Sequence, residues 1–161
     1  DSLNSTGPCY TIGTDAAFRV DLKMKIIDVS DFDVACVGFR KQEAYTAAIE
    51  ADGELITDYT DIACLNANIG QIDKNTRINS ATGTATDTSD NWDDGDTKTF
   101  SVLVSSAGVV TFLIDGAAPT TNTNTLTFDS GDVVIPFMAF TVAATTADTP
   151  PVLVSFFAGH Q

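Results

Sequence analysis

Positive charge is scarce in this sequence. The chain has 8 Lys and Arg against 22 Asp and Glu, a formal net charge of −14. Such a surface repels the phosphates of nucleic acids and anionic membrane head groups, and no apolar run reaches the roughly 18 residues of a membrane-spanning helix. We therefore predict no nucleic-acid partner and no membrane partner, and we expect the acidity to favour solubility, cation binding or a basic partner.

Residues that usually carry catalysis are also few. The only His is His160, so a Ser-His-Asp or Cys-His arrangement would have to be built on a short tail at the chain end. Glycoside hydrolysis needs two positioned carboxylates, yet Glu43, Glu50 and Glu54 all lie in a segment without strand alternation. There is no glycine-rich phosphate loop and no His-Glu-x-x-His motif. We predict that the protein is not an enzyme.

The three cysteines are too widely spaced for a zinc site. Cys9, Cys36 and Cys64 are not arranged in the close pairs that metal-binding cysteines usually form. Cys36 and Cys64 lie in similar apolar, strand-like contexts, each preceded by Asp-x-Ala. Two interpretations follow: both are buried free thiols that act as small apolar side chains, or they form a Cys36–Cys64 disulfide.

What the sequence has in abundance is β-strand patterning. In the clearest strand, 16–29, apolar residues alternate with Arg19, Asp21, Lys23 and Lys25, which predicts one core face and one solvent face. The three bases form a small cationic stripe. They either meet the acids of a partner or pair with the chain's own Asp residues across neighbouring strands.

The remaining patterning predicts the fold class. Pro136 favours an edge position or a bulge for its strand, and 42–51 favours a short helix, with a strand as the alternative. Eight to ten strands with at most one short helix predict an all-β fold, a two-sheet antiparallel jelly-roll sandwich. Besides 16–29, strands are predicted at 34–39, 62–67, 69–78, 98–104, 110–114, 126–129, 133–142 and 152–158.

The start of the chain differs from the rest. Residues 1–15 show little periodicity and predict an N-terminal arm or loop, followed by a single β-sandwich domain over 16–161. We expect this arm to dock on a neighbouring molecule through Leu3, Pro8 and Tyr10.

Aspartates crowd into the predicted loop 79–96. Calcium takes six to eight oxygen ligands, but the spacing is not that of an EF-hand, because Trp92 and Ser101 stand where ligands are required. The alternative is an acidic turn whose side chains accept hydrogen bonds from their own backbone. The candidate ligands of a noncanonical Ca²⁺ site are Asp90, Asp93, Asp94 and Asp96, and no other cofactor is expected.

The single Trp also has two interpretations. With Tyr10, Tyr45 or Tyr59, Trp92 would form a ligand platform on which a sugar stacks. The alternative is a residue that covers the hydrophobic core.

The stretch from Trp92 to Gly116 resembles the concanavalin A-like and laminin G-like sandwich. In that superfamily a Trp-containing turn precedes two antiparallel strands, and an aromatic-aliphatic-Asp-Gly sequence ends the second. Here the turn is Trp92-x-x-Gly95, the first strand contains 100–104, and the second ends in Ile114-Asp-Gly116. The resemblance implies a fold and says little of function.

A narrower likeness involves Val34–Lys41, Asp61–Asn66 and Ser105–Gly116. Together they are similar to structural proteins of tailed phages, whose domains of this type decorate heads or form fibres. The resemblance implies a virion protein on the particle surface that acts by association, as a capsid decoration protein or part of a head or tail fibre. It also implies a homo-oligomer that contacts the major capsid protein or another virion protein. The alternative is a lectin-like carbohydrate-binding module that uses Trp92, the acidic loop and Ca²⁺ to bind a surface glycan.

Overall fold

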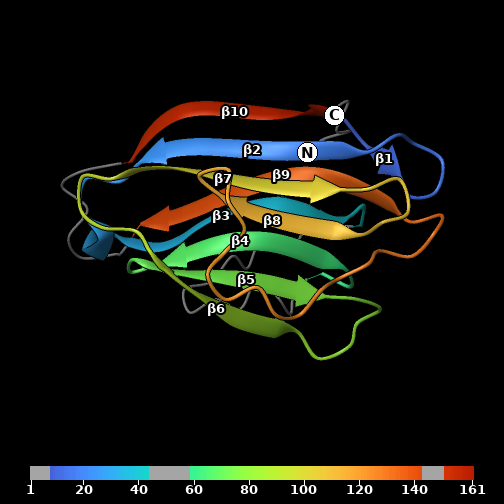
Figure 1. Cartoon of the computed structure of the whole chain (residues 1–161), viewed down its shortest axis with the longest axis horizontal. Helices are drawn as coiled ribbons and strands as arrows, with labels where there is room; N and C mark the ends of the chain where they lie inside the picture. Colours follow the sequence, from blue (N-terminus) through green and yellow to red (C-terminus); the bar gives the residue numbers. More distant parts are fainter. Residues whose placement is uncertain (1–7, 44–58, 143–150) are drawn as a thin grey trace.

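Two antiparallel sheets pack face to face around an apolar core (Figure 1). The computed structural model describes residues 8–43, 59–142 and 151–161. The six-stranded sheet has the order β1-β9-β3-β4-β5-β6, and the four-stranded sheet has the order β10-β2-β7-β8. The strands are β1 (Tyr10–Thr11), β2 (Phe18–Lys25), β3 (Phe32–Lys41), β4 (Ile62–Asn68), β5 (Gln71–Arg77), β6 (Thr84–Asn91), β7 (Thr97–Val104), β8 (Val110–Ile114), β9 (Val133–Val142) and β10 (Val152–His160).

The predicted fold class is confirmed. Within the described ranges the only helical turn is η1 (Val29–Asp31), and no helix there is long and apolar enough to cross a membrane. The predicted helix at 42–51 lies largely outside the described residues. Three strands differ from expectation. β1 lies inside the predicted arm or loop 1–15, and β6 lies inside the predicted loop 79–96. The predicted strand 126–129 contributes only a bridge between Thr127 and Val109.

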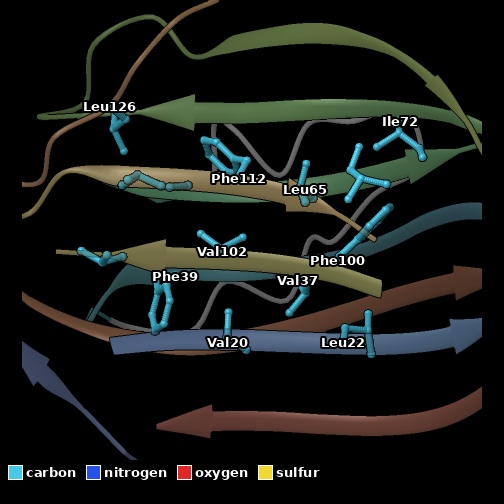
Figure 2. Packing of buried hydrophobic residues seen from close by; sticks show 14 of the residues in the cluster. Val20, Leu22, Val37, Phe39, Leu65, Ile72, Phe100, Val102, Phe112 and Leu126 are labelled. Carbon is cyan, nitrogen blue, oxygen red and sulfur yellow. The ribbon is translucent and has the colours of Figure 1, made fainter. Parts of the chain in front are cut away.

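The core is built by residues that alternate along the strands, as predicted. On β2 the register places Val20 opposite Val102 and Leu22 opposite Phe100 of β7. Figure 2 shows these side chains meeting Val37 and other apolar residues of the opposite sheet between the two layers. Each large apolar side chain buried here stabilises the fold by about 1.5–3 kcal/mol.

One side of the sandwich is open. β9 pairs with β1 only at Val133 and Val134, so the rest of its outer edge has no described strand partner. Pro136 lies on this free part of β9, which confirms the predicted edge position. β10 is the outermost strand of the other sheet, at the top of Figure 1, and no strand of the described ranges pairs with its outer edge.

Candidate functional site

A shallow groove of about 550 Å³ crosses the outer face of the four-stranded sheet. The polar half of the β2 alternation lines its centre, because Arg19, Asp21 and Lys23 point away from the core. The strand registers then place two rows of side chains across the sheet. One row is Phe157, Asp21, Ser101 and Leu113, and the other is Ser155, Lys23, Thr99 and, at the end of β8, Asp115.

An exposed aromatic ring forms one end of the groove. Phe157 is 47% exposed, and the end of its ring lies over Gly159 two residues along β10. A Cβ at Gly159 would lie 2.8 Å from the Cζ atom of the ring, so the absence of a side chain leaves room for the ring along the strand. The Arg19 guanidinium lies 5.6 Å from the ring centroid, within cation–π range.

The groove also holds two of the chain's few positive charges. Arg19 forms an ion pair with Asp21 of its own strand, with a nitrogen–oxygen distance of 2.8 Å. Among the residues that the structure describes, neither Lys23 nor Lys25 has an acidic partner. The prediction that the cationic stripe pairs with Asp residues across strands is therefore wrong, because the facing strand positions carry Thr97 and Thr99. The Lys23 ammonium is left available to a ligand.

A second hollow, of about 420 Å³, lies near the start of the β3–β4 connection. Its charged groups already have partners. Lys41 Nζ lies 2.6 Å from Asp132 and 3.5 Å from Asp61, and Glu43 accepts hydrogen bonds from Thr60. We assign this hollow to the scaffold.

The predicted calcium ligands do not converge. Asp90 accepts two hydrogen bonds from Thr120, and Asp94 accepts the backbone N–H of Val29. Among the described residues no group of three or more His, Cys, Asp or Glu side chains is placed to hold a metal ion. The predicted calcium site of Asp90, Asp93, Asp94 and Asp96 is therefore wrong. The alternative predicted that the aspartates accept hydrogen bonds from their own turn, but Asp90 and Asp94 accept them from other segments, at Thr120 and Val29.

Trp92 belongs to the core. It is 1% exposed, its ring meets that of Phe100 edge-on with centroids 5.0 Å apart, and its Nε1–H donates to the Asp96 carbonyl at 3.1 Å. The prediction of a ligand platform on Trp92 is wrong because no face of the indole is available. The alternative, a residue that covers the core, is confirmed.

The docking arm is only partly described. Tyr10 is 4% exposed and stacks on Phe18 with ring centroids 4.2 Å apart, so its assignment to a docking surface is wrong. Its pairing through β1 with Val134 draws it into the sandwich. Pro8 is exposed, and its docking role stays a prediction, while Leu3 lies outside the described residues.

His160 does not lie in a tail beyond the last strand. It is the final residue of β10, opposite Phe18, and its exposed ring meets Tyr10 edge-on with centroids 5.2 Å apart. The following residue, Gln161, donates its backbone N–H to the carbonyl of Ala17. The end of the chain is therefore held by the four-stranded sheet.

Cys36 and Cys64 are buried free thiols, and Cys9 is an exposed one. A hydrogen bond with Cys36, together with burial, holds the pKa of Cys64 well above its ordinary value, so that it stays protonated at neutral pH. The predicted Cys36–Cys64 disulfide is therefore wrong, and the alternative of buried thiols is confirmed.

We expect a thiol reagent to modify one cysteine per native chain, Cys9, and all three after denaturation. Burial keeps the reagent from the two core thiols, and the raised pKa of Cys64 also removes its nucleophilic thiolate. Counting reactive thiols with and without denaturant under non-reducing conditions measures this. One reactive thiol under both conditions would show that a disulfide joins the core pair.

Solved structures share this arrangement of sheets. An alginate lyase from Pseudomonas aeruginosa superposes with a TM-score of 0.56 and 11% identity, covering 94% of this chain and 68% of that chain. Galectin LEC-6 from Caenorhabditis elegans gives a TM-score of 0.49 and 12% identity, covering 96% of this chain and 91% of that chain. The fold is a jelly-roll β-sandwich.

At such low identity the likeness shows the fold alone. No protein-family model matches the sequence, and no curated protein matches it. Of the resemblance to concanavalin A-like sandwiches, the two-sheet antiparallel architecture is confirmed. Neither of the two structures is a virion protein, so the narrower likeness to phage proteins gains no support from them.

The sequence pointed to part of the groove and missed its aromatic end. The alternation of β2 placed Arg19 and Lys23 on a solvent face, as the structure has them. Phe157 was assigned only to a terminal strand, although the spacing Phe157-Ala-Gly159 carries the relevant signal. A glycine two residues from an aromatic on the same strand face leaves a flat space for the ring.

Proposed function

We propose that this protein binds carbohydrate in the groove across β10, β2, β7 and β8. Sugars present apolar C–H faces and a rim of hydroxyl groups, so their sites combine an aromatic ring with hydrogen-bonding side chains. The observation that carries the proposal is the exposed Phe157 ring, which lies along its strand beside Arg19. Lys23 and the hydroxyl groups of Thr99 and Ser155 line the same groove.

The charge of the groove supports the same class of ligand. Arg19 and Lys23 offset Asp21 and Asp115 here, so the groove is locally near neutral on a chain of net charge −14. It accepts neutral sugars without repulsion. Lys23, which has no acidic partner among the described residues, adds a donor for a carboxylate on an acidic sugar. The proposed site replaces Trp92 and the acidic loop, on which the sequence-based glycan hypothesis rested.

We propose binding without turnover. The carboxylate of Asp21 is paired with Arg19, and that of Asp115 accepts the backbone N–H of Thr99 at 2.7 Å. Both acids in the groove therefore have partners of their own. The role of a virion protein on the particle surface, in contact with a capsid protein, remains a prediction from the sequence likeness.

Phe157→Ala tests the proposal. The probe is a soluble, monovalent oligosaccharide that the wild type binds on a glycan array. We expect the variant to bind it about 10- to 30-fold more weakly, because covering the exposed part of the ring is worth about 1.5–2 kcal/mol. Calorimetric titration measures this affinity. Because we propose binding without turnover, no new chain ends should be detected after the oligosaccharide is incubated with the protein.

Phe156→Ala is the matched control. It removes the same side chain one residue away, on the opposite face of β10 and with a similar exposure of 41%. We expect it to bind the oligosaccharide as the wild type does. An array without hits, or equal affinities for wild type and Phe157→Ala, would contradict the proposed site.

A further inference from the structure

An apolar seam runs along the open side of the sandwich. It is formed by six exposed residues of β9 and β10. Apart from the pairing of β1 with Val133 and Val134, the outer edges of these two strands have no strand partner in the described part of the chain. Each of the six residues is between 39% and 54% exposed. The apolar seam consists of Met138 and Phe140 on β9, and of Val152, Leu153, Val154 and Phe156 on β10.

Four of the six side chains in the seam lie on the inward faces of the two sheets but are not covered by the opposite sheet. Met138 and Phe140 lie opposite Val37 and Ala35 on β3, so they share the inward face of their sheet. Leu153 and Phe156 lie opposite Met24 and Leu22 on β2 and share the inward face of the other sheet. The inward faces of both sheets thus extend past the point where the sheets cover each other.

A small molecule does not fit this place. The pocket between the two edges, lined by residues such as Met24, Cys36 and Leu153, has a volume of about 30 Å³. That is room for little more than one water molecule. The seam is an exposed surface along two strands rather than a cavity.

We propose that the apolar seam binds a second copy of this chain, with the two β10 strands pairing antiparallel about a twofold axis. Antiparallel pairing of a strand with its own copy satisfies both free edges at once and closes the assembly at a dimer. The six side chains present roughly 500 Å² per copy, towards the upper end of what a typical monomer exposes in one patch. With the backbone edges added, this approaches the roughly 800 Å² per partner of a standard interface.

The two strands of the seam carry no charge that would oppose pairing with a copy of the same chain. Residues 133–140 and 152–160 contain no Asp, Glu, Lys or Arg, although 19% of the chain is charged. Two molecules of net charge −14 approach with least repulsion through such uncharged strands. A free edge that is not meant to pair usually carries a Lys or an inward-pointing charge, and β10 has neither.

Pairing through β10 also joins the two proposed sugar-binding grooves, and this part rests on the proposed function. Each groove includes Ser155 and Phe157, so an eight-stranded sheet would carry two grooves side by side on one face. We expect a repeating polysaccharide on a surface to be retained at least about 10-fold better by the dimer than by a monomeric variant. A monovalent oligosaccharide should bind both equally.

The test is the mass in solution across a dilution series, measured by light scattering. We expect twice the chain mass of 17.0 kDa for the wild type. Leu153→Asp on β10 and Phe140→Asp on β9 each bring a charge into the seam, and each should weaken the dimer by about 100-fold or more. Ile69→Asp is the control, since Ile69 is 64% exposed in a turn away from the seam and its removal should leave the dimer intact.

Circular dichroism establishes that each variant is folded, and hydrogen exchange of β10 amides gives a second readout that needs no substitution. Protection of these amides should fall as the wild type is diluted to monomer. A monomer at every concentration, an assembly larger than a dimer, or a dimer indifferent to both seam variants would each overturn the proposal. None of these outcomes depends on sugar binding, so the dimer and the proposed function fail separately.

Discussion

Replacing Trp92 with Ala should destabilise the fold by about 3–5 kcal/mol and leave sugar binding unchanged in the variant that remains folded. The indole is 1% exposed, so its removal leaves a cavity between the sheets next to Phe100. The hydrogen bond from Nε1–H to the Asp96 carbonyl is also lost. For a chain of this length, the melting temperature should fall by roughly 10 °C or more, which thermal denaturation followed by circular dichroism measures.

Trp92→Phe is the graded control for this effect. It keeps an aromatic ring beside Phe100 and should lose only about 1–3 kcal/mol. Oligosaccharide titration well below the melting temperature separates stability from binding. A variant that melts like the wild type but no longer binds the sugar would show that Trp92 is a ligand platform after all.

Replacing Lys41 with Met should cost about 1–3 kcal/mol at neutral pH, less than the loss of a fully buried pair, because the Lys41 side chain is 34% exposed. The ammonium lies 2.6 Å from Asp132 and 3.5 Å from Asp61, whose side chain is 1% exposed. The variant leaves both carboxylates without their cation. One oxygen of Asp132 is already buried without a hydrogen-bond partner, so the loss of Lys41 leaves this carboxylate with little to offset its charge. Urea unfolding of wild type and variant at the same pH measures the difference.

The pH dependence of this difference follows from the direction of the pKa shift. The hydrogen bond to Asp132 is the largest cause that raises the pKa of Lys41 above 10.5. The ion pair therefore stabilises the fold fully below pH 10.5, and its contribution is lost as the pH rises through the higher pKa of the folded state. We expect the stabilities of wild type and Lys41→Met to converge in that alkaline range.

Lys98→Met is the matched control for Lys41→Met. Lys98 also faces two carboxylates, Asp96 and Asp115, but at 4.0 and 3.9 Å, and these acids are about half exposed. Its removal should cost less than about 1 kcal/mol, because water replaces the lost partner. Equal losses for the two variants would contradict the claim that Lys41 matters because its carboxylate partners, Asp61 and Asp132, are largely buried.

Alternation along single strands carried most of what the sequence predicts about the fold. In β2, apolar and polar residues exchange faces at every step, and the structure buries and exposes them accordingly. In β9, the predicted bounds 133–142 are those observed, and Pro136 lies at the free edge that its missing N–H requires.

Local pattern failed where neighbouring strands decide the structure. β6 has the sequence TATDTSDN, which contains one apolar residue, and it is a strand because it pairs with β5. This is the usual dominance of tertiary context over β-propensity. Tyr10 lay in an aperiodic segment, yet two residues of pairing with β9 suffice to stack its ring on Phe18.

The candidate site was only half predictable for the same reason. The sequence shows that Arg19 and Lys23 share a solvent face, but not that β10 lies beside them and brings Phe157. The aspartates of 90–96 are close together in the sequence, which suggested a metal site. In the fold their side chains have separate partners that the spacing does not reveal, such as Thr120 for Asp90. Which side chains converge depends on strand order, and strand order is a property of the whole sandwich.

Sugar binding in the groove of the four-stranded sheet can be located by titrating an oligosaccharide into isotope-labelled protein and following the backbone amides by NMR. We expect the largest shifts on the segments that line the groove, Arg19–Lys23, Thr99–Ser101 and Ser155–Phe157. Shifts concentrated instead at Asp90–Asp96, or on the outer face of the six-stranded sheet, would contradict the proposed site.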